Sequence, residues 1–99
     1  MALIRSMLCE PQAKPRLAEI ESARADVEEL ISGTFFLLDL GDGLGAVFDA
    51  DGNKKIKDLN RVIDGIPIFG LCIFCRHDGQ GELLSLEADE LAEMEKLLA

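Results

Sequence analysis

Ten consecutive uncharged residues, Ile66 to Cys75, constrain the fold of this chain more than any other segment. The run is too short to span a bilayer, and β-branched and aromatic residues are frequent in it. Turn-forming residues bound it on both sides, Asp64-Gly65 before it and His77-Asp78-Gly79 after it. The segment therefore predicts a strand that is buried on both faces and needs other elements to cover each face.

The composition indicates one acidic domain. The 99 residues are 48% hydrophobic, which is enough for a single domain, residues 1–99, with a modest core. Nineteen acidic residues against ten basic ones leave a formal net charge of −9. Because this charge repels nucleic-acid phosphates, we expect no direct nucleic-acid binding, and we expect basic protein surfaces as partners.

The N-terminal stretch and the cysteines indicate a cytoplasmic protein. Arg5 interrupts the apolar run of the first residues and no small-residue cleavage site follows, so we expect no signal peptide and no membrane segment. The three cysteines are Cys9, Cys72 and Cys75. An odd number of cysteines in a chain with a core of its own favours reduced thiols over a disulfide framework.

The periodicity of apolar residues predicts two helices and several strands. One helix is expected between an N-cap at Ser22 and a left-handed Gly33, and the other from about Ala88 to Leu98. The strand-like runs are 2–9, 16–20, 34–40, 44–50, 66–75 and 82–86. We expect an α+β fold in which a mainly antiparallel sheet of five or six strands carries both helices on one face. The other face then needs cover, which a homodimer would supply.

Two short patterns resemble metal sites, and neither has the spacing that a metal requires. Cys72 and Cys75 match C-x-x-C, but positions three apart on a strand point to opposite faces, so the sulfurs diverge. The acidic turn Asp49–Asn53 resembles the start of a calcium loop, yet its sixth position is Lys54 and its twelfth is Asn60. We therefore expect no bound metal and no cofactor.

No pattern of residues indicates catalysis. His77 is the single histidine of the chain and lies beside Asp78 in a polar turn. None of the serines, threonines or cysteines stands in a recognisable nucleophile motif. We therefore expect His77 to be a solvated turn residue, no catalytic residue, and a protein that is not an enzyme.

Asp39, Asn60 and Arg61 are the candidate ligand-binding residues. Asp39 falls on an otherwise apolar strand face, where it either reaches water at the strand end or pairs with a cation such as Arg61. The segment Lys54–Ile63 holds four of the ten basic residues. The runs 34–40 and 44–50 are expected to form a hairpin around Gly41-Asp42-Gly43. In a cleft near the hairpin tips, Arg61 would clamp a phosphate or a carboxylate, which makes a small-ligand binding module one alternative function.

The C-terminal helix and its approach carry six carboxylates against Lys96 alone. A charged outer face is ordinary on an amphipathic helix, and carboxylates in the first turn complement the helix dipole. The same face is also a candidate docking surface for a basic partner. The candidate partner-binding residues are Glu87, Glu90, Glu93 and Glu95.

From Val27 onward the chain resembles a family of small bacterial and phage proteins defined only as a domain of unknown function, which is frequent in gut Firmicutes, plasmids and mobile elements. The similar stretches are VEELISG, DLGDGLGAVFDADGN, the dipeptide Asn60-Arg61, IPIFG and DGQGELLSLEADEL. The chain departs from the family at Lys57-Asp58-Leu59, where a proline-containing segment is usual, and at Glu87, where a Thr or Ser cap is usual. The resemblance implies a phage or mobile-element origin rather than a mechanism.

These patterns together favour a non-enzymatic accessory protein of phage or mobile-element origin that binds a basic host or element protein. Its most specific form is antagonism of a nucleic-acid-binding defence protein by charge mimicry. The alternatives are the small-ligand module at Asn60 and Arg61 and, third, an enzyme of unknown type.

Overall fold

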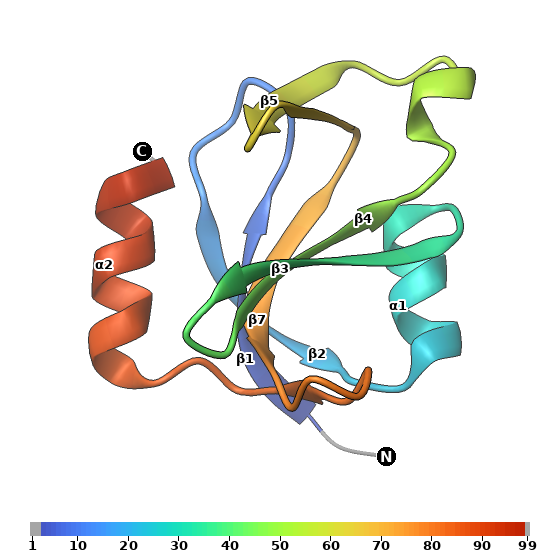
Figure 1. Cartoon of the computed structure of the whole chain (residues 1–99). Coiled ribbons are helices and arrows are strands. Elements are labelled where there is room, and N and C mark those ends of the chain that lie inside the picture. Colours follow the sequence, from blue (N-terminus) through green and yellow to red (C-terminus); the bar gives the residue numbers. More distant parts are fainter. Residues whose placement is uncertain (1–2, 99) are drawn as a thin grey trace.

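The computed structural model describes the backbone of residues 3–98 and the side chains of residues 3–96, so Ala2, the first residue of the predicted strand 2–9, lies outside the described residues. Figure 1 shows the chain as an α+β fold, as predicted. The elements are β1 (Leu3–Cys9), β2 (Arg16–Glu21), α1 (Arg24–Ile31), β3 (Phe35–Gly41), β4 (Leu44–Asp49), a 3₁₀ turn η1 (Gly52–Lys54), β5 (Leu59–Ile63), β6 (Ile66–Phe69), β7 (Cys72–His77), β8 (Leu83–Leu84) and α2 (Ala88–Leu98).

The main sheet is antiparallel throughout and runs in the order β2-β1-β7-β4-β3, with β8 beside β7. Strands β5 and β6 form a separate two-stranded sheet. The middle position of β7 explains why its first four residues are uncharged, because Cys72, Ile73, Phe74 and Cys75 are at most 1% exposed. The prediction of a strand buried on both faces is confirmed for this half of the uncharged run.

The other half of that run belongs to a different strand, so the expected single strand 66–75 is wrong. Gly70 has a φ of +79°, outside the β region, and it ends the extended segment after Phe69. Its N–H donates to the carbonyl of Asp58 at 2.9 Å, which fixes the turn. Strand β6 then pairs with β5, while β7 pairs with β1 and β4.

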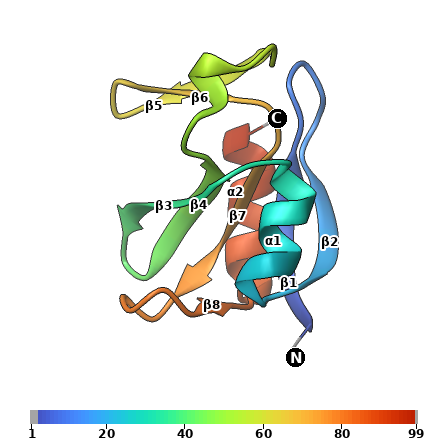
Figure 2. The ribbon, with the colours of Figure 1, turned by 90° about the vertical axis from the view of Figure 1, so that its right-hand side faces the viewer.

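The two helices lie on opposite faces of the main sheet, which corrects the expectation that both pack on one face (Figure 2). Val27 and Ile31 of α1 belong to the core cluster that includes Ile73. Met94 of α2 belongs to the cluster that includes Phe74. Alternation along β7 gives each helix its own set of side chains. Because α2 and β6 cover the second face, the argument for a homodimer loses its premise.

Helix α1 ends one residue earlier than predicted. Ser32, with φ 54° and ψ 47°, takes the left-handed position that we expected for Gly33, and Ala23 rather than Ser22 is the N-cap residue. The N–H groups of Ser32 and Gly33 donate to the carbonyls of Glu29 and Glu28, which closes the last turn. Gly33 is needed for a different reason, since a Cβ there would overlap the carboxylate of Asp49.

The Asp49 carboxylate has more hydrogen-bond and ion-pair partners than any other carboxylate described. The Asp49 side chain is 1% exposed. Its Oδ1 accepts hydrogen bonds from the backbone N–H groups of Thr34 and Asp51, both at 3.0 Å. Its Oδ2 lies 2.8 Å from Lys55 Nζ and 2.9 Å from Lys57 Nζ. Four charge-assisted contacts replace the water that burial removes.

The two lysines extend this cluster to the C-terminus of α1. Lys57 Nζ donates to the carbonyls of Ile31 at 2.9 Å and Ser32 at 3.1 Å, and Lys55 Nζ donates to Ser32 O at 3.3 Å. Cations here satisfy carbonyls that have no partner within the helix and complement its dipole. The cluster of Asp49, Lys55 and Lys57, called the Asp49 clamp below, therefore joins α1, β3, β4 and the segment before β5.

We predict that Gly33→Ala destabilises the protein by about 1–3 kcal/mol, because its Cβ must displace the Asp49 carboxylate. Ser32→Gly is the matched control in the same turn, and it relieves a left-handed backbone rather than adding an overlap. We expect the control to change the free energy of unfolding by less than about 1 kcal/mol. Urea unfolding midpoints measure both. Equal midpoints for Gly33→Ala and the wild type would contradict the close approach of Asp49.

The Asp49 clamp also predicts a pH dependence. Burial alone would raise the pKa of Asp49, but hydrogen bonds from Lys55, Lys57, Thr34 and Asp51 outweigh it and hold the pKa well below the ordinary value of 3.8. Since the folded-state pKa is the lower one, the carboxylate contributes stability that is present above pH 3.8 and lost as the pH falls towards the folded-state value.

Accordingly, Asp49→Asn should cost about 3 kcal/mol at pH 7, because the two lysines lose their buried partner. The difference from the wild type should hold down to about pH 4 and shrink below it. Asp51→Asn, an exposed carboxylate in the same turn, is the control, with an expected effect within about 0.5 kcal/mol. Urea unfolding from pH 7 to pH 2 tests this. A difference that stays constant to pH 2 would show that the Asp49 carboxylate is not the origin of the stabilisation.

Candidate functional site

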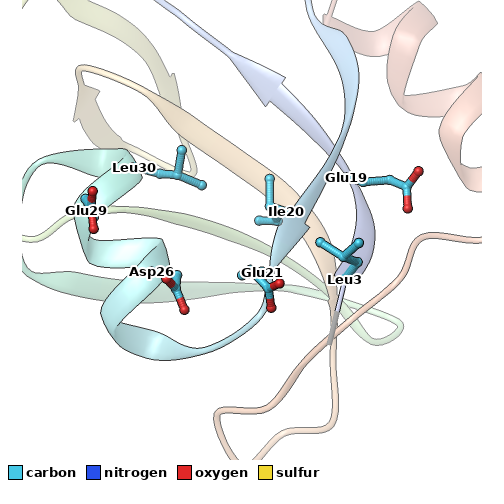
Figure 3. A pocket seen from close by; sticks show the side chains of 7 residues that line it. All are labelled: Leu3, Glu19, Ile20, Glu21, Asp26, Glu29 and Leu30. Atoms are coloured by element: carbon cyan, nitrogen blue, oxygen red, sulfur yellow. The ribbon is translucent and has the colours of Figure 1, made fainter. Parts of the chain in front are cut away.

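A groove of about 530 Å³ lies between α1 and β2, the outer strand of the main sheet (Figure 3). Its acidic lining residues are Glu19, Glu21, Asp26 and Glu29. Its aliphatic lining residues are Leu3, Ile20 and Leu30. Among the described side chains, no basic one lines this groove. We call this concavity the acidic groove.

The local sequence explains how the acidic groove forms. Along β2 the side chains alternate, so Ile20 is buried against α1 while Glu19 and Glu21 face the other way at the strand edge. On α1, Glu29 follows Asp26 by three positions and Leu30 follows it by four. This spacing places the three residues on one stripe of the helix. Figure 3 shows Leu30 pointing from the helix towards Ile20 on β2.

Two of the three aliphatic residues that line the acidic groove, Leu3 and Leu30, are largely exposed. Leu3 is 61% exposed and Leu30 is 41% exposed, and Leu17, farther along β2, is 57% exposed. Exposed aliphatic groups beside carboxylates suit a ligand that is itself both apolar and cationic. The aliphatic stems and charged heads of arginine and lysine have this character.

The carboxylates of the acidic groove lack partners within the described side chains. The ion pairs found among the described side chains involve other carboxylates, namely Glu28, Asp39, Asp49 and Glu90. Glu21 Oε2 is a buried oxygen without a hydrogen-bond donor. A buried carboxylate oxygen without a donor is costly, and a donor from a bound cationic group would remove that cost.

The structure places Asn60 and Arg61 in internal contacts. Asn60 Nδ2 donates to the carbonyls of Cys9 at 2.7 Å and Gly70 at 2.8 Å. Arg61 Nε donates to Asn60 Oδ1 at 3.0 Å, and the guanidinium group lies 6.0 Å from the centre of the Phe74 ring. Arg61 Nη2 also lies 2.6 Å from Cys9 Sγ. These contacts fasten β5 to the end of β1.

Asp39 lies elsewhere and does not join that pair. Its side chain is 69% exposed, and its Oδ1 accepts from the Gly41 N–H at 3.1 Å and lies 3.1 Å from His77 Nε2. The hydrogen bonds from Gly41 and His77 lower the pKa of Asp39. The side chain that bonds Asp39 is thus that of His77, through Nε2, rather than that of Arg61. The three candidate ligand-binding residues do not form one cluster.

His77 is not the solvated turn residue that we expected, because its side chain is only 7% exposed. Gly45 on the neighbouring strand leaves room for the ring, since a Cβ there would lie 2.9 Å from His77 Cδ2. The Gly79 N–H donates to Nδ1 at 3.1 Å, and Nε2 lies 3.2 Å from the Leu44 carbonyl. Protonation on Nε2 satisfies every one of these contacts. No local sequence pattern indicates the space that Gly45 provides, because it arises from pairing between β4 and β7.

The acidic face of α2 divides into one bonded residue and several exposed ones. Glu90 Oε1 accepts from the Glu87 N–H at 2.8 Å, which is half of a capping box, and Glu90 Oε2 pairs with Arg76. Glu87, Glu93 and Glu95 are exposed. Glu90 therefore stabilises the start of α2, and three of the four candidate partner-binding residues remain on the surface.

Cys72 and Cys75 point to opposite faces of the sheet, as predicted, and they belong to different core clusters. Burial raises the pKa of each thiol to about 12. Within residues 3–96 no group of three or more His, Cys, Asp or Glu side chains is placed to hold a metal ion. No helix in the described part of the chain is long and apolar enough to cross a membrane.

We predict that the native protein reacts very slowly with a thiol reagent such as Ellman's reagent, because Cys9, Cys72 and Cys75 are all 0% exposed. In denaturant the same sample should release three equivalents of coloured product at once. Rapid reaction of one or more native thiols would show that the cysteine-bearing strands open to solvent.

Comparison with known proteins identifies the family. The model of a domain of unknown function, DUF3846, matches residues 4–99. No curated protein and no solved structure matches the chain. Because the family model covers nearly the whole sequence, the chain belongs to the DUF3846 family of domains of unknown function.

Proposed function

We propose that this protein is a non-enzymatic accessory protein that binds a basic segment of a partner protein in the acidic groove between α1 and β2. One observation carries the proposal: four carboxylates line a groove whose remaining walls are aliphatic, and none of the ion pairs among the described side chains involves them. Arginine and lysine side chains match both properties, because their stems cover apolar surface while their heads pair with carboxylates.

Electrostatics favours the groove over a flat acidic surface. An exposed ion pair contributes only about 0–1 kcal/mol, because water and salt screen it. A concave site lined by one sign of charge concentrates its field, and a basic segment along β2 would meet Asp26 and Glu29 on the side of α1 and Glu19 and Glu21 on the other side. Glu21, with one oxygen already buried, is the group in this site that gains most from a donor.

The acidic face of α2 has a secondary part in this proposal. Its central residue, Glu90, already bonds Glu87 and Arg76. The exposed Glu93 and Glu95 add to the net charge of −9 and attract basic partners at long range. We propose that these exposed carboxylates raise the rate of association, whereas the acidic groove holds the basic segment in the bound complex.

The resemblance to proteins of phages, plasmids and other mobile elements supports an accessory role in such an element. A nucleic-acid-binding defence protein is a fitting target, because its phosphate-binding surface is rich in arginine and lysine. Occupying that surface would block nucleic acid by charge mimicry. The small-ligand alternative has less support, because the internal contacts of Asn60 and Arg61 account for both side chains.

A pair of charge-matched variants tests the proposal. The groove variant replaces the acidic lining residues, as Glu19→Gln, Glu21→Gln, Asp26→Asn and Glu29→Gln. The control variant removes four exposed carboxylates at and before α2, as Glu82→Gln, Asp89→Asn, Glu93→Gln and Glu95→Gln. The probe is a fluorescent peptide of alternating arginine and valine, and anisotropy reports its binding.

We expect the groove variant to bind this peptide at least about tenfold more weakly and the control variant to lose less than about threefold. Affinity for the wild type should fall steeply as the salt concentration rises. Equal losses in the two variants would mean that overall charge, and not the groove, attracts the peptide. No binding to the wild type would refute the proposal.

A further inference from the structure

The acidic groove lies beside an open edge of the main sheet. Strand β2 pairs only with β1, through six consecutive residue pairs from Leu3↔Glu21 to Leu8↔Arg16 without a bulge. None of the other backbone hydrogen bonds in the described part of the chain involves residues 16–21. On the side away from β1, every second residue of β2 therefore presents its N–H and C=O to solvent.

The opposite edge of the sheet differs. In β3 the register shifts between Asp39 and Gly41, and such a bulge interrupts pairing with a further strand. Proteins usually protect an edge strand by a bulge, a proline within it or charged side chains along it. β2, with the sequence RLAEIE, has no bulge and no proline, and its charged residues are Arg16 at the start and the carboxylates of Glu19 and Glu21. The edge beside the acidic groove is thus regular, and its negative charge leaves it open to a strand of positive charge.

A strand added to this edge would meet the same chemistry on both of its faces. Side chains directed towards α1 would contact Ile20 and Leu30 and reach Asp26 and Glu29. Side chains directed to the other face would meet the exposed Leu17 and, two positions along β2, Glu19. Each face offers aliphatic surface with carboxylates beside it, so an extended segment rich in arginine or lysine is complementary to both.

We propose that the partner's basic segment binds as an additional β-strand against β2, with its backbone hydrogen-bonded to β2 and its arginine or lysine side chains in the acidic groove. This inference rests on the proposed function and specifies the conformation of the bound segment. Backbone pairing would supply affinity that is largely independent of sequence, while the carboxylates would select the positive charge.

N-methylated peptides test strand addition separately from charge attraction. The probe is the peptide Arg-Val-Arg-Val-Arg-Val-Arg with capped ends. One analogue carries N-methyl groups on every residue, so neither of its edges can donate to β2. Two more carry them on the arginines alone or on the valines alone, which leaves one donating edge intact. All four peptides have the same charge, and the protein is the same in every measurement.

We expect the fully methylated peptide to bind at least about tenfold more weakly than the unmodified one, and at least one half-methylated peptide to bind within about threefold of it. Amide hydrogen exchange should slow in β2 on binding and stay unchanged in β3. Equal binding of the unmodified and fully methylated peptides would overturn strand addition and leave the proposed function intact. No binding of the unmodified peptide would overturn both.

A second copy of the chain is the competing occupant of this edge. Light scattering on the protein without peptide measures its oligomeric state, and hydrogen exchange measures whether the β2 amides are protected. A dimer whose β2 amides are already protected would overturn the proposal. We expect a monomer with exchanging β2 edge amides.

Discussion

The rest of the structure depends on one buried carboxylate, Asp49 at the end of β4. Its contacts join segments that are distant in sequence: the turn after α1, the start of β3 and the lysines that precede β5. The same lysines occupy the carbonyls at the C-terminus of α1, so the helix is held at its last turn rather than only by Val27 and Ile31. Since α1 forms one wall of the acidic groove, the position of that wall depends on the Asp49 clamp.

The sheet separates two cores that serve different purposes. One core holds α1 and so supports the acidic groove, and the other holds α2 and the β5–β6 hairpin. Strand β7 contributes to both, because Ile73 and Phe74 point to opposite sides. Asn60 and Arg61 belong to the second core's rim, where they secure the hairpin to β1. Asn60 and Arg61, which the sequence suggested as ligand-binding residues, thus connect the two sheets.

Local patterns predicted most elements, whereas long-range contacts decided what the patterns left open. Alternation and turn residues identified the β3–β4 hairpin and the opposite directions of Cys72 and Cys75. An apolar helix stripe, however, indicates that a helix packs without indicating on which face, so the placement of α2 was wrong. Gly33 was recognised as necessary for the wrong reason, because Asp49 is sixteen positions away. Glu19 and Glu21 alternate visibly in the sequence, but only the neighbouring stripe of α1 makes them part of a groove.

The pairing of cations inside the molecule changes how copies of the chain meet one another. Lys55, Lys57 and Arg76 pair with Asp49 and Glu90, so three of the ten basic side chains are neutralised internally. Two β2 edges that approach each other would bring their glutamates close together, and like charges that face one another across strands are destabilising. The carboxylates beside β2 would therefore disfavour pairing between the β2 edges of two copies in a concentrated solution. They would leave the edge open to a strand of opposite charge.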